Sequence, residues 1–503
     1  MKNLIDTIKK YLSPFFNTRA AGLYILLFAA AIGTATFIEN DFGTSAAQKV
    51  IYKSWWFELL LALFAITIIV NIFKFRMIQQ KKWPLLLFHG AIIIILIGAA
   101  VTRYHSFEGI MHIRENDSAN SFLSSNAFLK FKVNKNDRSF DFDEPVLFAS
   151  LGNNSWREEY LVDGDLITID VKDFIPNPKQ VLTESIDGRA TLQIVVSGAN
   201  GREEYFISEG QTKRIRNVIY NFKNAQIPDA INIAYRNDSL LFNTNKTLTQ
   251  MEMVTQRRDT FLPSSTYKPL KLRSLYSDGV NNFVLTDFKK KGKIHIESED
   301  SKVRNESLTA LLLDVSVNGN TKEAYVYGRR GVAGRPQQLI FDGLDLAVSY
   351  GAKEITVPFE VKLNKFIMEK YPGTNSAASY ASEVTLVDQA NNVNMDYRIF
   401  MNNILDYGGY RFFQSSFDKD ERGTYLSVNH DFWGTWISYL GYVLLTIGMI
   451  LTLFNKKTRF YQVTQKIKKL RARSSTFIFV LFLTTSFSFA QSQTFVDNAV
   501  DVE

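Results

Sequence analysis

The sequence contains no cysteine, and this absence excludes several classes of chemistry. Without cysteine there can be no disulfide framework, no thiolate metal site, no Cys-x-x-Cys redox motif and no c-type haem attachment motif. The chain also lacks an HExxH sequence, a P-loop and a nucleophile elbow, so nothing in it indicates a hydrolase. Any large domain outside the cytoplasm must therefore be held together by its core alone.

Long apolar runs, by contrast, are plentiful. Four of them are long enough to cross a bilayer as helices, at about 20–37, 57–73, 84–101 and 434–454. A fifth run, Thr476–Ala490, is shorter and follows a basic stretch, so it resembles a secretory signal. Its internal position favours an uncleaved fifth helix instead.

Basic residues are concentrated in short segments beside these runs. The stretches 74–82 and 455–473 carry bases and no acid, and the amino-terminal segment is also basic. Such segments lie on the cytoplasmic side of a membrane. The net charge of +8 therefore indicates membrane orientation and not nucleic-acid binding. The amino terminus is predicted to be cytoplasmic, and the region between the third and fourth runs to lie outside.

That outer region, 105–431, is polar and rich in short alternating patterns, so we predict a large β-rich domain. Three hairpins are predicted where Asn and Gly, or a polar Asn-rich loop, separate two alternating segments, at 198–201, 318–320 and 389–394.

The size and the carboxy-terminal end of the β-rich domain give two further predictions. More than 300 residues exceed what one core usually covers, which suggests two lobes, with a seam near Asn245–Ser265. A last hairpin, Tyr410–Phe417 with Thr424–Val428, leads almost directly into the fourth run. The predicted organisation is a membrane domain at 1–104, the outer β domain at 105–431, helix four at 432–455, a basic cytoplasmic loop at 456–475, helix five at 476–491 and an outer tail at 492–503.

One ionisable side chain, His89, lies inside the third apolar run. An ionisable group in hydrocarbon is costly and is interpreted as functional by default. Two interpretations stay open: His89 binds a metal or haem iron, or it only hydrogen-bonds a neighbouring helix. A ligand histidine needs a partner for its second ring nitrogen. We expect Asn71 to be that partner, because adjacent antiparallel helices would bring it to a similar depth.

The other four histidines are weaker candidates. His295 lies in a charged alternating stretch typical of an ordinary strand. His105 and His112 follow the third run, where an interfacial or loop role is favoured over ligand binding. His430 stands just before the fourth run, and a capping or hydrogen-bonding role is favoured there over iron ligation. It is retained only as possible support for the His89 site.

Several short motifs lie towards the two ends of the chain. They are Gly33–Glu39, Tyr52–Phe57, Leu87–Gly90, Phe107–Gly109, Ile113–Glu115 and Gly409–Gln414, the last leading to Ser427–Trp436. With three apolar runs, a long β domain and a returning run, they resemble the ResB (CcsB) component of the system II cytochrome c biogenesis machinery. The middle of the outer domain matches only in general character. The fifth run resembles the join to CcsA in fused ResB–CcsA proteins.

The resemblance implies a multi-pass α-helical protein of the bacterial inner membrane with a large periplasmic β-rich domain. It implies a component that binds haem b in the membrane and helps to deliver it for covalent attachment to apocytochrome c. His89 matches the transmembrane histidine that serves in this family as an axial haem ligand. Nothing in the chain resembles the tryptophan-rich motif of CcsA. We therefore expect a CcsA-like subunit or fused domain as partner, and no ligation by this chain alone.

Two other functions remain open. The chain could be a non-enzymatic, membrane-anchored scaffold or apocytochrome chaperone in which His89 is merely structural. It could also be a transporter of another small molecule, but paired inverted repeats or broken helices, which are typical of transporters, are not visible in the sequence. Haem copurification separates the first of these from the haem-binding interpretation.

Overall fold

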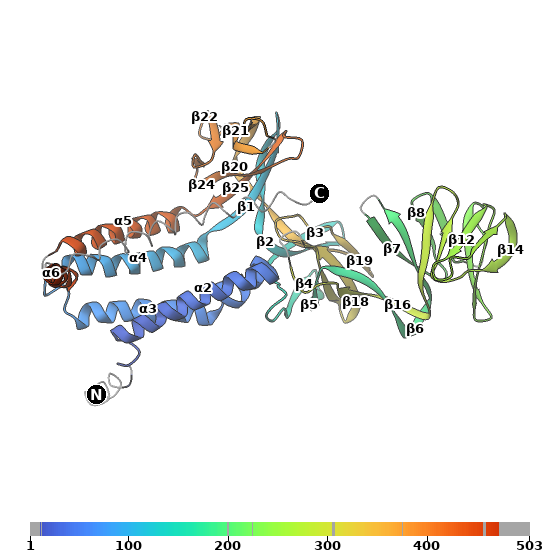
Figure 1. Ribbon diagram of the computed structural model, residues 1–503, viewed down its shortest axis with the longest axis horizontal. Helices are drawn as coiled ribbons and strands as arrows, with labels where there is room; N and C mark the ends of the chain where they lie inside the picture. The colour runs from blue at the N-terminus through green and yellow to red at the C-terminus, as the bar shows by residue number, and fades with distance from the viewer. Residues whose placement is uncertain are drawn as a thin grey trace. The chain divides into compact units, whose positions relative to one another are not determined.

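The computed structural model describes residues 11, 13–198, 201–223, 225–303, 307–374, 376–455 and 459–471. The chain divides into two compact units. Unit 1 consists of residues 1–37, 50–126 and 354–503, and unit 2 of residues 38–49 and 127–353. Unit 1 contains most of the helices and one β-sheet, whereas unit 2 is built mainly of strands (Figure 1).

Four helices in the described part of the chain are long and apolar enough to cross a membrane. They are α2 (Thr18–Ala47), which continues into the π-helix η1 (Gln48–Tyr52), α3 (Trp55–Lys74), α4 (Trp83–His105) and α5 (Phe432–Phe454). A shorter helix, α6 (Arg459–Arg471), follows α5. The predicted apolar helices near the amino terminus and the large β-rich region are therefore confirmed, while the predicted fifth helix at 476–491 lies outside the described residues.

Helices α4 and α5 pack along each other (Figure 1), and small residues allow the close approach. Gly434, Gly441 and Gly448 recur every seventh residue of α5 and are buried against α4. A Cβ on Gly441 would lie 2.6 Å from Ile95 Cγ1, and one on Gly448 would lie 2.8 Å from the backbone nitrogen of Phe88. Only glycine therefore fits at these positions without moving α4.

The sheet of unit 1 closes around its own core. Tyr397 on β22 donates a hydrogen bond to the carbonyl of Ile404, which lies next to β23, at 2.9 Å, so the two ends of the sheet meet. Alternate residues such as Met111, Val361 and Leu426 are fully buried inside. The strand order is β22-β21-β20-β2-β1-β25-β24-β23, with bounds β1 (Phe107–Arg114), β2 (Ser118–Lys135), β20 (Leu344–Lys370), β21 (Ala377–Asp388), β22 (Val393–Phe400), β23 (Leu405–Tyr407), β24 (Tyr410–Phe417) and β25 (Gly423–His430).

Unit 2 contains two hydrophobic cores. The first lies between a four-stranded sheet and the strands continuous with β2 and β20, and it buries alternate residues such as Phe131, Ile169 and Leu313. Its remaining strands are β3 (Arg138–Val146), β4 (Trp156–Val162), β5 (Asp165–Pro176), β17 (Thr309–Val317), β18 (Asn320–Gly328) and β19 (Gln337–Phe341).

The second core of unit 2 is formed by two further sheets, of six and five strands, and buries large aromatic side chains such as Tyr220, Phe242 and Tyr276. The six-stranded sheet contains β6 (Pro178–Gly198), β7 (Gly201–Ser208), β12 (Leu248–Glu252), β13 (Arg258–Phe261), β15 (Ser274–Ser277) and β16 (Asn282–Ser298). The five-stranded sheet contains β8 (Thr212–Ile215), β9 (Val218–Asn221), β10 (Ala230–Arg236), β11 (Ser239–Thr244) and β14 (Ser264–Pro269).

The last residues of α2 and the first two residues of η1 belong to unit 2 and contact its other residues. The carbonyl of Asp41 accepts a hydrogen bond from the backbone of Val303 at 3.1 Å. Lys49 donates to Asn154 Oδ1 at 2.5 Å and lies over the ring of Phe148. Gly43, with φ of 77°, interrupts the helix between these contacts. Residues 38–49, which follow the predicted apolar run at 20–37, are thus part of the β-rich unit.

The predicted hairpins are confirmed, but the predicted seam is wrong. The four hairpins are β6–β7, β17–β18, β21–β22 and β24–β25. No core boundary lies near Asn245–Ser265, because Phe242, Leu248 and Leu270 share one core and β11 pairs with β14 across that stretch. A polar hairpin loop inside a core has the same composition as a linker, so composition misplaced the boundary.

An asparagine ladder crosses the second core on β9, β10 and β11. Asn221, Asn232 and Asn243 are at most 5% exposed. The Asn221 amide donates to Asn232 Oδ1 at 2.8 Å, and the Asn232 amide donates to Asn243 Oδ1 at 3.1 Å. Asn232 also exchanges two hydrogen bonds with the backbone of Ile227. Buried amides that are fully paired in this way fix the register of neighbouring strands.

Replacing Asn232 with alanine is expected to destabilise the fold by about 2–4 kcal/mol, because it leaves several buried donors and acceptors unpaired. The loss of folding stability is measured from the proteolytic susceptibility of the full chain across a urea series. Asn245→Ala is the matched control: Asn245 is exposed and makes a single surface hydrogen bond, to Asp229, so we expect a change within about 0.5 kcal/mol. Equal effects of the two substitutions would contradict a stabilising ladder.

Candidate functional site

His89 lies in the second turn of α4, on the face directed at α3. Residues one turn before and one turn after it on that face pack against a cluster on and just after α3. The contacting residues are Leu85, Leu86, Ile92 and Ile93 of α4 with Ile68, Ile72 and Met77. The imidazole is half-buried. It therefore points towards the neighbouring helix and not outward.

The ring of His89 is oriented by its own helix. Nδ1 lies 2.8 Å from the backbone carbonyl of Leu85. A carbonyl only accepts, so Nδ1 carries the proton and donates it. Nε2 then holds the lone pair, and it makes no hydrogen bond to any residue that the structure describes. A neutral imidazole with one nitrogen fixed and the other available is the form that ligates iron or another metal.

Asn71, the expected partner of His89, lies on α3 between Ile68 and Ile72 of the facing cluster. It is 5% exposed, and its Oδ1 accepts no hydrogen bond from a described residue. The structure describes no hydrogen bond between Asn71 and His89; the contact of Nδ1 is with the Leu85 carbonyl. The buried Oδ1 of Asn71 therefore has no hydrogen-bond donor among the described residues. Buried polar atoms are rarely unpaired, so this one requires an explanation.

The two ends of α4 are held by different contacts. Near its start, the backbone at Phe88 lies against Gly448 of α5. Near its end, Thr102 donates to the buried carboxylate of Asp431 at 2.6 Å, and the same carboxylate caps α5 by accepting from the Gly434 amide at 3.1 Å. These contacts fix the position of the helix that carries His89.

A second polar cluster joins the end of α4 to the start of α3. Arg103 pairs with Glu58 and donates to the carbonyl of Tyr52. Sequence reasoning missed this pair, although a basic residue in the last turn of one apolar helix and an acid in the first turn of its neighbour is a readable signal.

His430 is not brought together with His89. It pairs with Phe107 in the β1–β25 ladder and stacks on that ring at 4.5 Å, with Tyr410 also 4.5 Å away. Phe107 follows His89 by 18 residues, nearly all helical, which is about 27 Å along a helix axis. The contacts of His430 are those of aromatic packing at the base of the sheet, and its supporting role at the His89 site stays a prediction.

His112, on β1 of the same sheet, belongs to an ionic cluster beside the turn that joins β24 to β25. Its Nε2 lies 2.9 Å from Asp418 Oδ2, and its ring stacks on Tyr425. Arg114 bridges Asp418 and Asp420, and its hydrogen bonds lower the pKa of Asp420 to about 2. His112 thus has a surface structural role.

His295 and His105 behave as expected. His295 sits on β16 between Thr183 at 3.1 Å and Glu297 at 2.6 Å. His105 is exposed at the end of α4. Neither contacts the face of α4 that carries His89.

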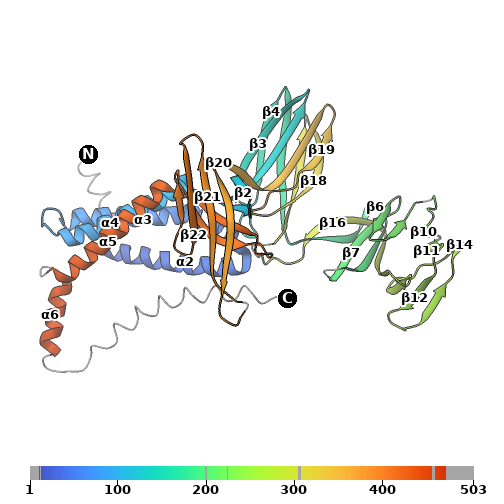
Figure 2. The ribbon, with the colours of Figure 1, turned by 90° about the horizontal axis from the view of Figure 1, so that it is seen from above.

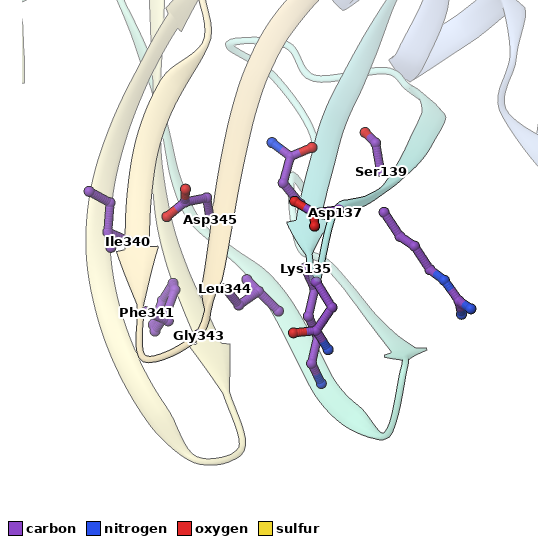
Figure 3. Close-up of a pocket in the computed structure, with 11 residues that line it drawn as sticks. Lys135, Asp137, Ser139, Ile340, Phe341, Gly343, Leu344 and Asp345 are labelled. Atoms are coloured by element: carbon purple, nitrogen blue, oxygen red, sulfur yellow. The ribbon is translucent and has the colours of Figure 1, made fainter.

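Unit 2 has an open pocket of about 570 Å³ between two turns, Asn134–Ser139 and Ile340–Asp345 (Figure 3). Its lining mixes charges of both signs with Phe341 and contains no histidine. The amine of Lys135 is already paired with Asp165 at 2.7 Å. No group of three or more metal-ligating side chains occurs among the described residues. The pocket therefore offers no site comparable to His89.

Comparison with known proteins bears on the closed sheet of unit 1. Residues 335–426, which cover β19 to the first half of β25, match the ResB-like family. This part of the chain is similar to ResB-like proteins. The resemblance predicted from the sequence is thereby confirmed, although His89 lies outside the matched residues.

A curated relative matches over a longer stretch. The chain is 28% identical over 448 residues to Protein NrfI of Wolinella succinogenes. The alignment covers 89% of this chain but only 35% of that protein, so the chain spans about a third of its relative.

Proposed function

We propose that this chain is the ResB-like component of a cytochrome c synthase, in which it binds haem b in the membrane and helps to deliver it to apocytochrome c. The ResB-like match supports a role in cytochrome c biogenesis. The observation that carries the haem-binding proposal is the geometry of His89, with Nδ1 held by the Leu85 carbonyl and Nε2 left available. Haem is the substrate here, carried and handed on.

The surroundings of His89 suit haem iron. Leu85, Ile92 and Ile93 present aliphatic surface beside the imidazole, which limits access of water to the iron. In this proposal His89 would supply one nitrogen ligand to the iron, and α5 keeps α4 in place through Gly448. A further ligand would come from a CcsA-like subunit or a fused CcsA domain.

We further propose that the four apolar helices cross the bacterial inner membrane, with the amino terminus in the cytoplasm. The β-rich region then lies in the periplasm, where apocytochrome c receives haem. The basic stretches 74–82 and 455–473, which contain no acid, support this orientation.

Copurification of haem tests the proposal. The full open reading frame, or this chain with its CcsA-like partner, is purified in detergent and examined by absorption spectroscopy after reduction. The expected result is a b-type haem spectrum at near-stoichiometric occupancy. Haem-free protein that still supports cytochrome c assembly would favour the second function, a scaffold for the partner or the apocytochrome, which the three β cores would equally suit.

We propose that Asn71 supports haem binding at His89, because its buried Oδ1 has no hydrogen-bond donor among the described residues. Replacing it with leucine removes an unsatisfied buried amide, so the protein is expected to remain as stable as the wild type. Haem occupancy should nevertheless fall, measured by the haem-to-protein absorbance ratio. If occupancy and spectrum are unchanged, the Leu85 carbonyl alone orients His89 and Asn71 has no part in the site.

A further inference from the structure

Helix α6 (Arg459–Arg471) is not used in the proposed function. It begins five residues after Phe454, the last residue of α5. Figures 1 and 2 show it running across the direction of α5. We propose that α6 lies in the plane of the membrane surface and binds anionic lipid headgroups.

The sequence of α6 is amphipathic. In the sequence, Phe460, Val463, Ile467 and Leu470 recur at intervals of three and four residues, which is the spacing of an apolar stripe on a helix. Val463 and Ile467 are 44% and 45% exposed. Two aliphatic side chains on one face of α6 are thus nearly half exposed in the part of the chain that the structure describes.

The charge of α6 has a single sign. The helix carries five basic residues, and no acid occurs anywhere between residues 455 and 473. They are Arg459, Lys466, Lys468, Lys469 and Arg471. A basic helix with an apolar stripe is the pattern of helices that lie at an anionic lipid surface.

The position of α6 in the chain indicates that its apolar face contacts the lipid surface. Five residues of extended chain span at most about 18 Å. Because α5 is long and apolar enough to cross a membrane, α6 begins close to the headgroups at its end. The bilayer supplies apolar depth for Val463 and Ile467 and negative charge for the bases, so no further protein is required.

The absence of native cysteine allows a direct test with the full chain, since one introduced cysteine takes a single label. Val463→Cys reports the apolar face. Gln465→Cys is the matched control, because two residues further along a helix is about 200° around its axis. Each variant carries an environment-sensitive fluorophore and is reconstituted in phosphatidylcholine vesicles, with or without phosphatidylglycerol.

The expected result is a blue-shifted emission and protection from an aqueous quencher at position 463 but not at 465, and stronger protection with phosphatidylglycerol. Changing Lys466, Lys468 and Lys469 to glutamine should lower the ratio of membrane-bound to free α6 about fivefold for each charge removed. Equal quenching at both positions would overturn the proposal. Protection at 463 that ignores both phosphatidylglycerol and the lysine substitutions would overturn it too, because the stripe would then be covered by protein.

Discussion

Replacing His89 with alanine is expected to remove the b-type haem spectrum from the purified protein, and added imidazole is expected to restore it. The substitution deletes the only nitrogen that this face of α4 offers to iron and leaves a space lined by Leu85, Ile92 and Ile93. Free imidazole can enter that space and ligate the iron in place of the side chain. Since loss of a mere supporting residue costs about 10–100-fold in metal affinity, loss of the ligand itself should cost more than about 100-fold.

The matched control for this experiment is His295→Ala. His295 is a histidine of unit 2 that bonds Thr183 and Glu297 on the surface, so its loss should leave the spectrum unchanged. An unchanged spectrum in His89→Ala would show that His89 does not touch iron. Loss of haem that imidazole fails to restore would leave disrupted helix packing as the cause, a point that the melting temperature of the variant decides.

The parts of the fold that the sequence predicted are those that local pattern determines. Apolar runs gave α2 to α5 because length and hydropathy alone select such segments. Hairpins such as β17–β18 were readable because Asn318 and Gly319 adopt the positive φ that the turn requires.

The parts that the sequence missed depend on contacts between distant residues. The core shared by Phe242, Leu248 and Leu270 forms only when β11 and β14 pair, so composition could not place a boundary there. The eleven-residue spacing of Asn221, Asn232 and Asn243 was visible, but it gains meaning only when their strands lie side by side.

At the candidate site, too, the sequence predicted what local pattern determines and missed what depends on contacts. Burial in hydrocarbon identified His89 from sequence, because an imidazole in an apolar run is rare. Its orienting partner was not identified, because a backbone carbonyl such as that of Leu85 carries no sequence signal. Asn71 was expected as that partner because adjacent antiparallel helices bring it to a similar depth. The structure describes the Leu85 carbonyl beside Nδ1, and the role of Asn71 at the site stays a prediction.

The glycine at position 448 is expected to matter for haem as much as the residues that surround the iron. In Gly448→Leu the new Cβ would lie 2.8 Å from the nitrogen and 3.0 Å from the Cα of Phe88, distances that backbone atoms cannot accommodate without moving. α4 must shift at the residue that precedes His89, so the imidazole leaves its position. We expect haem affinity to fall by about 10–100-fold, as it does when an orienting contact of a metal ligand is lost. Haem titration of the purified variant measures the change.

Gly90→Ala separates this effect from a general sensitivity of the helix. Gly90 also adjoins His89, but a Cβ placed on it meets nothing within 4 Å. Alanine should therefore strengthen α4 by up to about 1 kcal/mol and leave haem affinity unchanged. If Gly90→Ala reduces affinity as much as Gly448→Leu, the backbone around His89 is sensitive to any side chain and the contact with α5 has no special part. If neither variant loses haem, the packing of α5 against α4 does not position the ligand. A loss confined to Gly448→Leu means that α5 sets where the imidazole meets the iron.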